Sequence, residues 1–482
     1  MLADLAQHAL ASGAEELAEP RLAAWLKTHP KDVTLLHWMA MLRRALDRRG
    51  EAIAALNEAR RYAPGNPGAA HALAHVSLEA GYPASALFEQ AIGLAPGKAE
   101  IRLGLASARF AEGEGERGLT ELDAMLAANP GWMEGHRRYA QLAALSGHGD
   151  RALSTIERAL ERFPQGDALR KLGMDLLLEA ERYPDALAAA ERAIAIRGAL
   201  AFFVLPRAAA LDELGRSEEA AALFAVLGAP QEIGHAVWRV RHWLRTGDLR
   251  RAVGEAEPWL APRGAEGMWP YAALAWRLAG DPRADWLDGR PGICKVIDLD
   301  SRQIGLDRLR ALLQRLHRGS GRFLDQSVRG GTQTEGALLA RMDPEIACVR
   351  EVLRREVAQF VSALPAPEAA HPMLSQARAA RPRFAGSWSV RLTDAGFHTA
   401  HHHPQGWVSS ALYLSVPGGL EGKEGQLDLG AAPAGLGVDL EPRHSVEPRE
   451  GRLVLFPSWM WHGTRPFRSG ERMTIAFDIA HT

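Results

Sequence analysis

Two segments near the end of the chain decide its fold: RLTDAGFHTAHHHPQGWVSSALYLSVP at residues 391–417 and GRLVLFPSWMWHGTRPF at residues 451–467. Each contains a short run of alternating apolar residues, and the runs SWSVRLTD, GQLDLG and ERMTIAFDI around them have the same character. Gly and Pro separate the runs. This spacing is typical of a small β-sandwich or barrel, and we expect one over residues 371–482.

The same two segments carry a cluster of histidines. His401, His402 and His403 are consecutive, His462 stands alone in an aromatic run, and Arg472 comes ten residues later. Residues two apart on a strand share a face, so His401 and His403 should point one way and His402 the other. Imidazole is a common metal ligand. The pattern predicts a metal site with an anchor for an acidic cosubstrate; the alternatives are a surface loop of histidines and a structural His462.

The first half of the chain is periodic. Prolines recur every 32 or 34 residues, at Pro30, Pro64, Pro96, Pro130 and Pro164. A small residue precedes each proline by twelve positions, and this series continues further along the chain: Ala18, Ala52, Ala84, Gly118, Ala152, Ala186, Ala220 and Ala252. Five residues earlier, glycine recurs at Gly13, Gly113, Gly147, Gly215 and Gly247. A period of about 34 indicates helix-turn-helix units, with the small residue at the helix contact and the glycine in the turn.

This pattern resembles the tetratricopeptide repeat over about residues 1–262. We expect an N-terminal α-solenoid at residues 1–265, in about eight units. The resemblance implies a concave face that binds an extended peptide or partner helix, which would be the substrate or another protein. Two other uses of the array stay open, namely formation of a homodimer and packing on the second domain.

Residues 266–370 are expected to form a helical connector and the first part of the second domain. A strand is predicted to begin near Ile297, and Ile304–Arg318 has the apolar period of an amphipathic helix. A further helix at Pro344–Leu364 is expected to back the sheet. Between the helices, Asp325–Thr334 is polar and contains glycine, which is typical of a loop. It is either a plain connection or part of the site.

The segments His401–Pro404 (HHHP) and Leu455–His462 (LFPSWMWH) resemble the iron(II)- and 2-oxoglutarate-dependent oxygenases, in particular a bacterial subgroup with HxHP and LFPSWxxH segments. The resemblance covers about residues 285–482. It implies a double-stranded β-helix, or jelly roll, as the catalytic domain. The whole chain is therefore predicted to be an α+β multidomain protein, in which an N-terminal α-solenoid precedes a jelly-roll domain with flanking helices.

The resemblance also implies roles for single residues. His401 and His462 would be iron ligands, and Arg472 would pair with the distal carboxylate of 2-oxoglutarate through its planar fork. Further predicted contacts to the cosubstrate are Thr474, Tyr413 and Arg391. The segment QSVRGGTQT is similar to segments in bacterial proteins that pair these two domains, which favours a place for it at the site. The predicted substrate contacts are Gln326, Arg329, Gln333 and Trp388.

The third iron ligand departs from the usual pattern. Most of the superfamily uses two histidines and one carboxylate, whereas this sequence has His403 where the acid is expected. A face of three neutral imidazoles can still hold iron(II). Alternatively His403 lies behind the ligands and an acid completes the site, the candidates being Asp394, Glu421 and Asp428.

These expectations together predict an iron(II)- and 2-oxoglutarate-dependent oxygenase that uses O2 and hydroxylates a protein or peptide presented by the repeats. One alternative is a small-molecule oxygenase whose repeats serve assembly. The other is a non-catalytic scaffold with a degenerate metal-binding sandwich.

The composition of the chain argues against several classes of partner and location. The 57 basic and 58 acidic side chains nearly cancel, which gives no charge excess for binding nucleic acid or an acidic membrane surface. Two cysteines cannot form a disulfide framework. The N-terminus lacks a signal-peptide pattern, and no apolar run approaches the roughly 18 residues of a membrane span. The sequence therefore predicts a cytoplasmic protein with no membrane or nucleic-acid partner.

Overall fold

The computed structural model describes residues 1–482 except 262–263, 320, 322–326, 377, 379–381 and 482. Backbone contacts divide the described chain into two compact units. The first is Met1–Ala128 with Glu335–Arg350, and the second is Asn129–Thr334 with Glu351–Thr482. The boundaries expected at residues 265 and 370 therefore stay a prediction.

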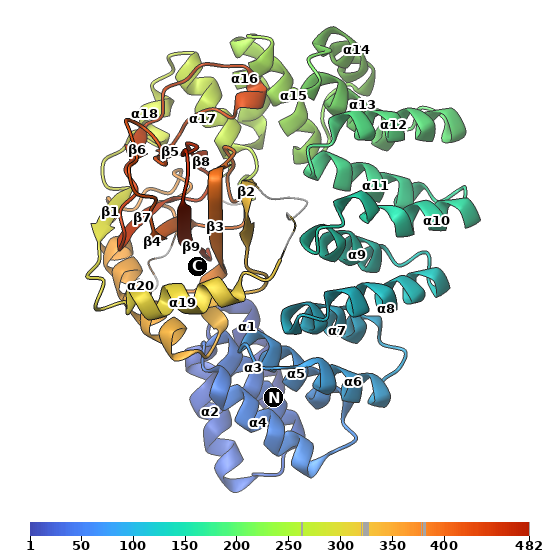
Figure 1. Cartoon of the computed structure of the whole chain (residues 1–482), viewed down its shortest axis with the longest axis vertical. Helices are drawn as coiled ribbons and strands as arrows, with labels where there is room; N and C mark the ends of the chain where they lie inside the picture. Colours follow the sequence, from blue (N-terminus) through green and yellow to red (C-terminus); the bar gives the residue numbers. More distant parts are fainter. Residues whose placement is uncertain (262–263, 320, 322–326, 377, 379–381, 482) are drawn as a thin grey trace. The chain divides into compact units, whose positions relative to one another are not determined.

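The first unit is built from antiparallel helix pairs (Figure 1). Its helices are α1 (Leu2–Ser12), α2 (Glu15–Thr28), α3 (Val33–Ala45), α4 (Arg49–Tyr62), α5 (Pro67–Glu79), α6 (Ser85–Leu94), α7 (Ala99–Glu112) and α8 (Gly115–Ala128). The second helix of each pair ends two residues before a proline of the periodic series, as α2 does before Pro30. Proline cannot continue a helix because it lacks the backbone N–H. A later segment, with the short helix η3 (Leu338–Ala340), joins this unit through the bond from Met342 N to Ala80 O, 3.0 Å.

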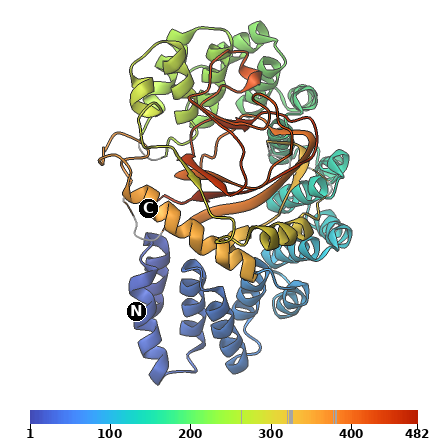
Figure 2. The same ribbon diagram turned by 60° about the vertical axis from the view of Figure 1, so that its left-hand side comes forward.

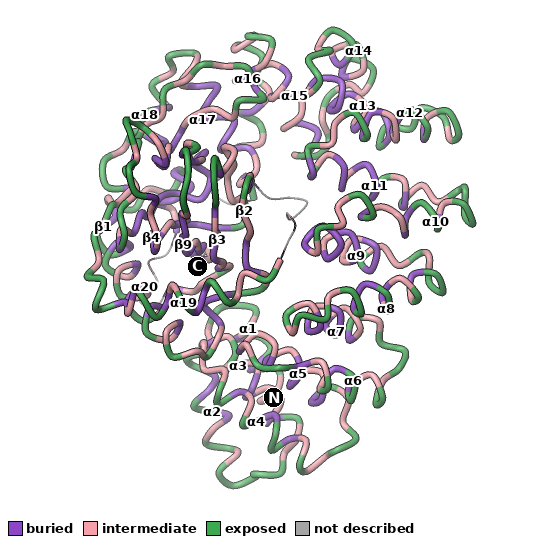
Figure 3. Tube along the Cα trace, viewed as in Figure 1, coloured by how far each residue is buried: buried purple, intermediate pink, exposed green. Residues whose placement is uncertain are grey.

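The second unit begins with more pairs of the same kind. They are α9 (Met133–Leu145), η1 (Gly149–Arg151), α10 (Ser154–Arg162), α11 (Asp167–Glu179), α12 (Tyr183–Arg197), α13 (Ala201–Glu213), α14 (Ser217–Leu227), α15 (Ile233–Arg245), α16 (Leu249–Ala256), η2 (Glu257–Trp259), α17 (Trp269–Leu278) and α18 (Arg283–Leu287). Buried residues follow the faces on which paired helices meet (Figure 3). All the predicted small residues, from Ala18 to Ala252, are buried. The turn glycines have positive φ, for example 86° at Gly147, which explains their recurrence.

Two sheets follow the repeats in the second unit. The larger has the order β1-β7-β4-β9-β3-β2 and the smaller the order β6-β5-β8. The strands are β1 (Lys295–Asp298), β2 (Val328–Gln333), β3 (Phe384–His398), β4 (Val408–Ser415), β5 (Leu427–Leu429), β6 (His444–Val446), β7 (Arg452–Pro457), β8 (His462–Thr464) and β9 (Glu471–Ile479). An antiparallel bridge between His401 and His462 extends the smaller sheet. Figure 2 shows the strands curled round a common interior, and the interleaved order is that of a double-stranded β-helix, which confirms the predicted fold class.

The helices expected beside the sheet are present. α19 (Leu306–Leu316) buries its leucines, and Arg310 donates to Leu414 O of β4 at 2.6 Å. In α20 (Pro344–Ser362), the Arg354 guanidinium lies 5.8 Å from the ring centre of Phe384 on β3. These contacts fix both helices to the larger sheet.

The segment predicted as a loop at 325–334 is largely a strand. β2 pairs with β3, with Val328 opposite His398 and Gln333 opposite Val390. Gly330 has φ 69° and marks a bulge, and a Cβ on Gly331 would lie 2.3 Å from Arg391 O. The two glycines therefore permit close pairing with β3 rather than mark a free connection.

Repeat helices of the second unit contact the loops of its smaller sheet. Trp461 Nε1 donates to Pro270 O at 3.0 Å, and Arg245 donates to Gly435 O at 2.9 Å. Arg277 donates to Gly430 O. Of these helices, α15 lies in the predicted repeat region and α17 in the predicted connector, so one repeat helix packs on the second domain, which is one of the uses left open by the sequence. Within the described residues, no helix has both the length and the apolar character needed to cross a membrane.

Candidate metal centre

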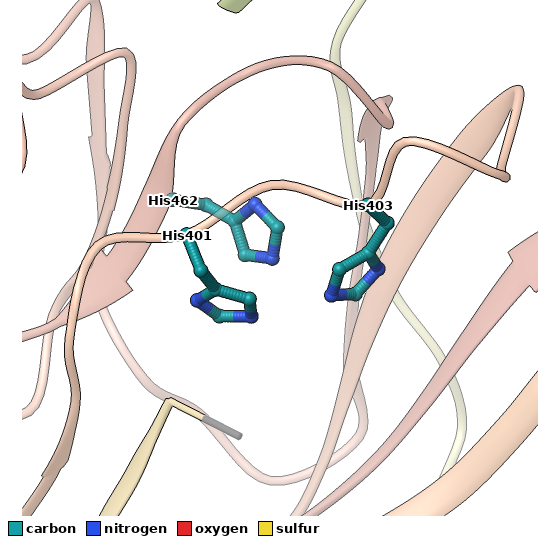
Figure 4. Close-up of side chains that lie close together, drawn as sticks. All are labelled: His401, His403 and His462. Carbon is teal, nitrogen blue, oxygen red and sulfur yellow. The ribbon is translucent and has the colours of Figure 1, made fainter. Parts of the chain in front are cut away.

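Three histidines face one another inside the curled sheets (Figure 4). His401, His403 and His462 each present a ring nitrogen, and these atoms all lie within 4.8 Å of one another. Backbone bonds hold the segments in place. His401 N donates to His462 O at 2.9 Å, His462 N donates to His401 O at 2.8 Å, and His403 N donates to Ser458 O at 2.9 Å. The segments 391–417 and 451–467, which are distant in sequence, therefore meet at the three histidines.

Hydrogen bonds set the tautomer of each ring. His401 Nδ1 is 2.9 Å from Thr399 O, and His462 Nδ1 is 3.0 Å from Met460 O. A carbonyl oxygen only accepts, so both Nδ1 atoms carry the proton and both Nε2 atoms are unprotonated. His403 Nδ1 is 2.8 Å from Asp478 Oδ1, which leaves its Nε2 free in the same way. Three unprotonated nitrogens directed at one space form a set of donors that fits iron(II).

Burial keeps the rings of His401 and His462 neutral. It lowers the pKa of His401 well below its usual value, and the neighbouring His462 and His403 lower it further. The pKa of His462 is also lowered well below 6.5, first by burial and then by His403. A neutral imidazole is the form that binds a metal, so the site needs no deprotonation at neutral pH.

The acids considered as a third ligand lie elsewhere. Asp394 accepts from Gly470 N at 3.1 Å, Glu421 pairs with Arg468 at 2.6 Å, and Asp428 pairs with Arg465 at 2.7 Å. Among the described residues, none of the three belongs to the histidine group. The arrangement favours His403 as the third ligand.

A carboxylate does reach the site, from behind His403. Asp478 is buried on β9, and it also accepts from Ser409 Oγ at 2.6 Å. A carboxylate behind a ligating histidine fixes the ring and raises its basicity, so the negative charge expected of a ligand acts here through an imidazole. Asp478 was not predicted, although it shares a strand face with Arg472 and Thr474 and an even spacing would have revealed it.

We expect Asp478→Asn to weaken metal binding about tenfold or more, because outer partners of ligating histidines typically contribute 10–100-fold in affinity. Asparagine keeps the acceptor oxygen but loses the charge. The measurement is a competition titration with cobalt(II), with the exposed Asp439→Asn as the matched control. Equal affinity in the two variants would contradict the role assigned to Asp478.

A cavity adjoins the three histidines. Its further lining is Trp388, Val390, His398, Ser410, Ala411, Leu427, Phe456, Gly463, Thr464, Arg472, Thr474 and Ala476. Trp388 packs edge-to-face on His403, with ring centres 5.3 Å apart. Thr474 was predicted as a cosubstrate contact and Trp388 as a substrate contact, and the structure places both side chains against this cavity.

Arg472 is a buried cation that lacks an anionic partner. Its side chain is 3% exposed, and no acidic side chain within the described part of the chain forms an ion pair with it. Its guanidinium donates to Tyr413 Oη at 3.1 Å and lies 4.9 Å from the centre of that ring, whereas Nε has no acceptor. Burying an unpaired charge is costly. An entering carboxylate would supply the missing partner, so the residues present fit an acidic cosubstrate.

The other predicted contacts lie outside the cavity lining. Arg391 pairs with Glu471 at 2.5 Å, and Arg329 pairs with Glu181 of the repeats. Gln333 is buried on β2, and Gln326 falls outside the described residues. His402 turns away from the other histidines as predicted, but it packs on Trp461, with ring centres 4.8 Å apart, rather than facing solvent.

The cavity lining contains a further histidine that was not predicted. His398 lies nearly parallel to His401, with ring centres 5.8 Å apart, and its Nδ1 is 3.1 Å from Ser327 Oγ. Burial lowers its pKa to about 3. The signal was available, because His398 stands three residues before His401 in the same segment.

The buried histidines predict that the metal-free protein loses stability in acid. Burial lowers the pKa of both His398 and His402 from 6.5 to about 3. Below 6.5 the unfolded chain binds the protons first, so acid favours unfolding. Each such histidine should remove about 1.4 kcal/mol of unfolding free energy per pH unit over this window. Urea unfolding at pH 7.5, 6.5 and 5.5 measures the effect; an unfolding free energy that stays constant would refute it, and His402→Phe should reduce the slope.

Comparison with known proteins supports both halves of this picture. Residues 386–478 match a family described as "Putative 2OG-Fe(II) oxygenase", and residues 83–145 match the tetratricopeptide repeat. A search of curated proteins gave no match.

Solved structures with similarity include both classes. MamA from Desulfovibrio magneticus RS-1 is 18% identical, with 34% of this chain and 95% of that chain covered and a TM-score of 0.30. A prolyl-4-hydroxylase from Pseudomonas putida is 20% identical, with 39% and 93% covered and a TM-score of 0.28. A TPR protein from Thermus thermophilus is 22% identical, with 39% and 97% covered and a TM-score of 0.28.

Proposed function

We propose that this chain, which joins a tetratricopeptide-repeat region to a 2OG-Fe(II) oxygenase domain, is an iron(II)- and 2-oxoglutarate-dependent hydroxylase of a protein or peptide. One observation carries the proposal: the cavity lined by the three histidines also holds the buried Arg472, which pairs with no acid among the described residues. A metal-binding face and a carboxylate anchor in one enclosed space are what this cosubstrate requires.

The residues divide the work as follows. His401, His403 and His462 would hold iron(II), and Arg472, Tyr413 and Thr474 would hold the distal carboxylate of 2-oxoglutarate. Bound iron(II) would supply the redox chemistry by which O2 and 2-oxoglutarate give succinate and carbon dioxide while a substrate C–H becomes C–OH. Trp388, Phe456 and Leu427 line the same cavity, and their apolar side chains exclude water from it.

A protein or peptide substrate is supported by the fold beside the site. Tetratricopeptide repeats commonly bind peptides, and helices of the N-terminal part contact the catalytic domain. Arg245 of α15 donates to Gly435 O between β5 and β6, and Trp461, the neighbour of His462, donates to Pro270 O of α17. These contacts to the catalytic domain also favour a second candidate, a small-molecule oxygenase in which the repeats brace that domain. The two candidates differ in substrate and share the cosubstrate chemistry.

Succinate release tests the shared chemistry. Purified protein with iron(II), ascorbate, O2 and 2-oxoglutarate should form succinate slowly alone and faster with substrate. A peptide pool and a metabolite pool are then searched for a one-oxygen mass gain. A gain confined to peptides supports the proposal, whereas one confined to metabolites supports the second candidate. Absence of iron-dependent succinate in every mixture refutes both.

A further inference from the structure

The turn between α11 and α12 has an unusual residue. Glu181 adopts φ 57° at the position where other repeats have glycine, such as Gly147 with φ 86° and Gly215 with φ 77°. A residue with a Cβ is disfavoured in this left-handed conformation. Such strain persists when the side chain serves a purpose that glycine cannot.

The side chain of Glu181 reaches out of the repeats to the catalytic domain. Its carboxylate forms an ion pair with the guanidinium of Arg329, which is 19% exposed. Arg329 belongs to β2, the strand at the end of the larger sheet, on the side of the repeat helices in Figure 1. The pair thus ties a repeat turn to an edge strand within one unit.

The same strand begins beside the metal centre. Ser327, two residues before Arg329, accepts at its backbone oxygen from Thr399 N at 3.0 Å. Its Oγ lies 3.2 Å from His401 Nε2, the nitrogen left free for the metal, and 3.1 Å from His398 Nδ1. A shift of β2 would therefore move a hydroxyl group at the face of the metal ligands.

The sequence of β2 contributes little to fixing the position of this strand. It is an edge strand with a bulge, and two of its residues, Gly330 and Gly331, have no side chain to pack. Glycine-rich edge strands specify their register poorly. The ion pair with Glu181 adds an anchor at the start of this strand, and the bond between His317 Nδ1 and Thr332 Oγ1, 2.9 Å, holds its other end.

We propose that Glu181 is a positioning residue of the metal centre. Its ion pair with Arg329 fixes β2, which begins next to Ser327 and pairs with His398 of β3 through Val328, so that both side chains stay beside His401. This inference rests on the proposed function only in requiring that the histidines bind a metal. By this proposal, a side chain of the repeats helps to position the residues of the metal centre.

The chain offers a matched control for the test. Asp47 occupies the equivalent turn between α3 and α4 with φ 58°, and its carboxylate pairs locally with Arg49 at 2.7 Å. Glu181→Gly and Asp47→Gly relieve the same backbone strain, so both should keep or raise the thermal midpoint. Glu181→Gly alone should weaken binding of cobalt(II) and of 2-oxoglutarate, about 3- to 10-fold as is typical of residues coupled to a site at a distance.

Three further variants separate charge from backbone effects. Glu181→Gln keeps the side-chain length and should show the same weakened binding. Glu181→Arg should weaken it as well, and adding Arg329→Glu should restore it by re-forming the pair. Wild-type affinities in Glu181→Gly, or no rescue by the double variant, would overturn the inference alone. Failure of the wild-type protein to bind cobalt(II) would overturn the proposed function together with it.

Discussion

His462→Ala should abolish iron(II) binding and reduce 2-oxoglutarate-dependent succinate formation by more than about 100-fold, since even the outer partners of ligating histidines contribute 10–100-fold. His462 Nε2 has its lone pair fixed toward the cavity by the bond from Nδ1 to Met460 O, 3.0 Å. Alanine leaves two histidines, and within the described residues no acid belongs to the group that could replace the third. Iron content after anaerobic loading and succinate formation are the measurements.

The matched control for this variant is His444→Ala, which removes an exposed histidine of β6. It should keep the iron content and the turnover of the wild-type protein. Because His462 also joins the backbone bridge to His401 through main-chain atoms, the alanine variant should remain folded, which circular dichroism checks. Full iron binding in a folded His462→Ala protein would contradict the assignment of this ligand.

Arg472→Met should weaken 2-oxoglutarate binding by about 100-fold, because truncating one partner of a buried charge pair costs about 2–5 kcal/mol. The same substitution should raise the thermal midpoint of the protein without cosubstrate. Methionine removes a buried cation whose Nε has no acceptor and which pairs with no described acid. Metal binding should be unchanged. Opposite effects on stability and affinity are the signature of a residue kept for its ligand, and a calorimetric titration with a thermal melt measures both.

Arg391→Met is the control within the same sheet. Arg391 lies opposite Met473 in the β3–β9 ladder, whereas Arg472 lies opposite Leu392. The two arginines therefore face different sides of the sheet, and Arg391 pairs with Glu471 instead. We expect little change in 2-oxoglutarate affinity. An equal loss in both variants would show that Arg472 has no special role.

The repeat helices could be predicted from the sequence because the residues that mark them act locally and recur at a fixed period. A proline of the periodic series follows the end of the second helix in each of the first five pairs, and a small residue such as Ala52 lies where two helices cross closely. The turn positions of Asp47 and Glu181 were not predicted, because glycine is the usual residue at a positive φ and these two residues adopt positive φ without it.

Part of the candidate site could also be predicted from the sequence. Spacing and resemblance predicted His401, His403, His462 and Arg472, which the structure brings to one cavity. β2 was not predicted, because a strand with adjacent glycines forms only through its pairing with β3, more than fifty residues later in the chain. Arg391 was misjudged because a single strand does not reveal which of its faces turns inward.

The most direct test of the central claim is anaerobic visible spectroscopy of the protein with iron(II) and 2-oxoglutarate. Chelation of iron(II) by the keto acid should give a charge-transfer band in the wild-type protein. We expect no band in His462→Ala, and a band in Arg472→Met only at much higher 2-oxoglutarate. Absence of the band from the wild-type protein, or an undiminished band in His462→Ala, would contradict the account.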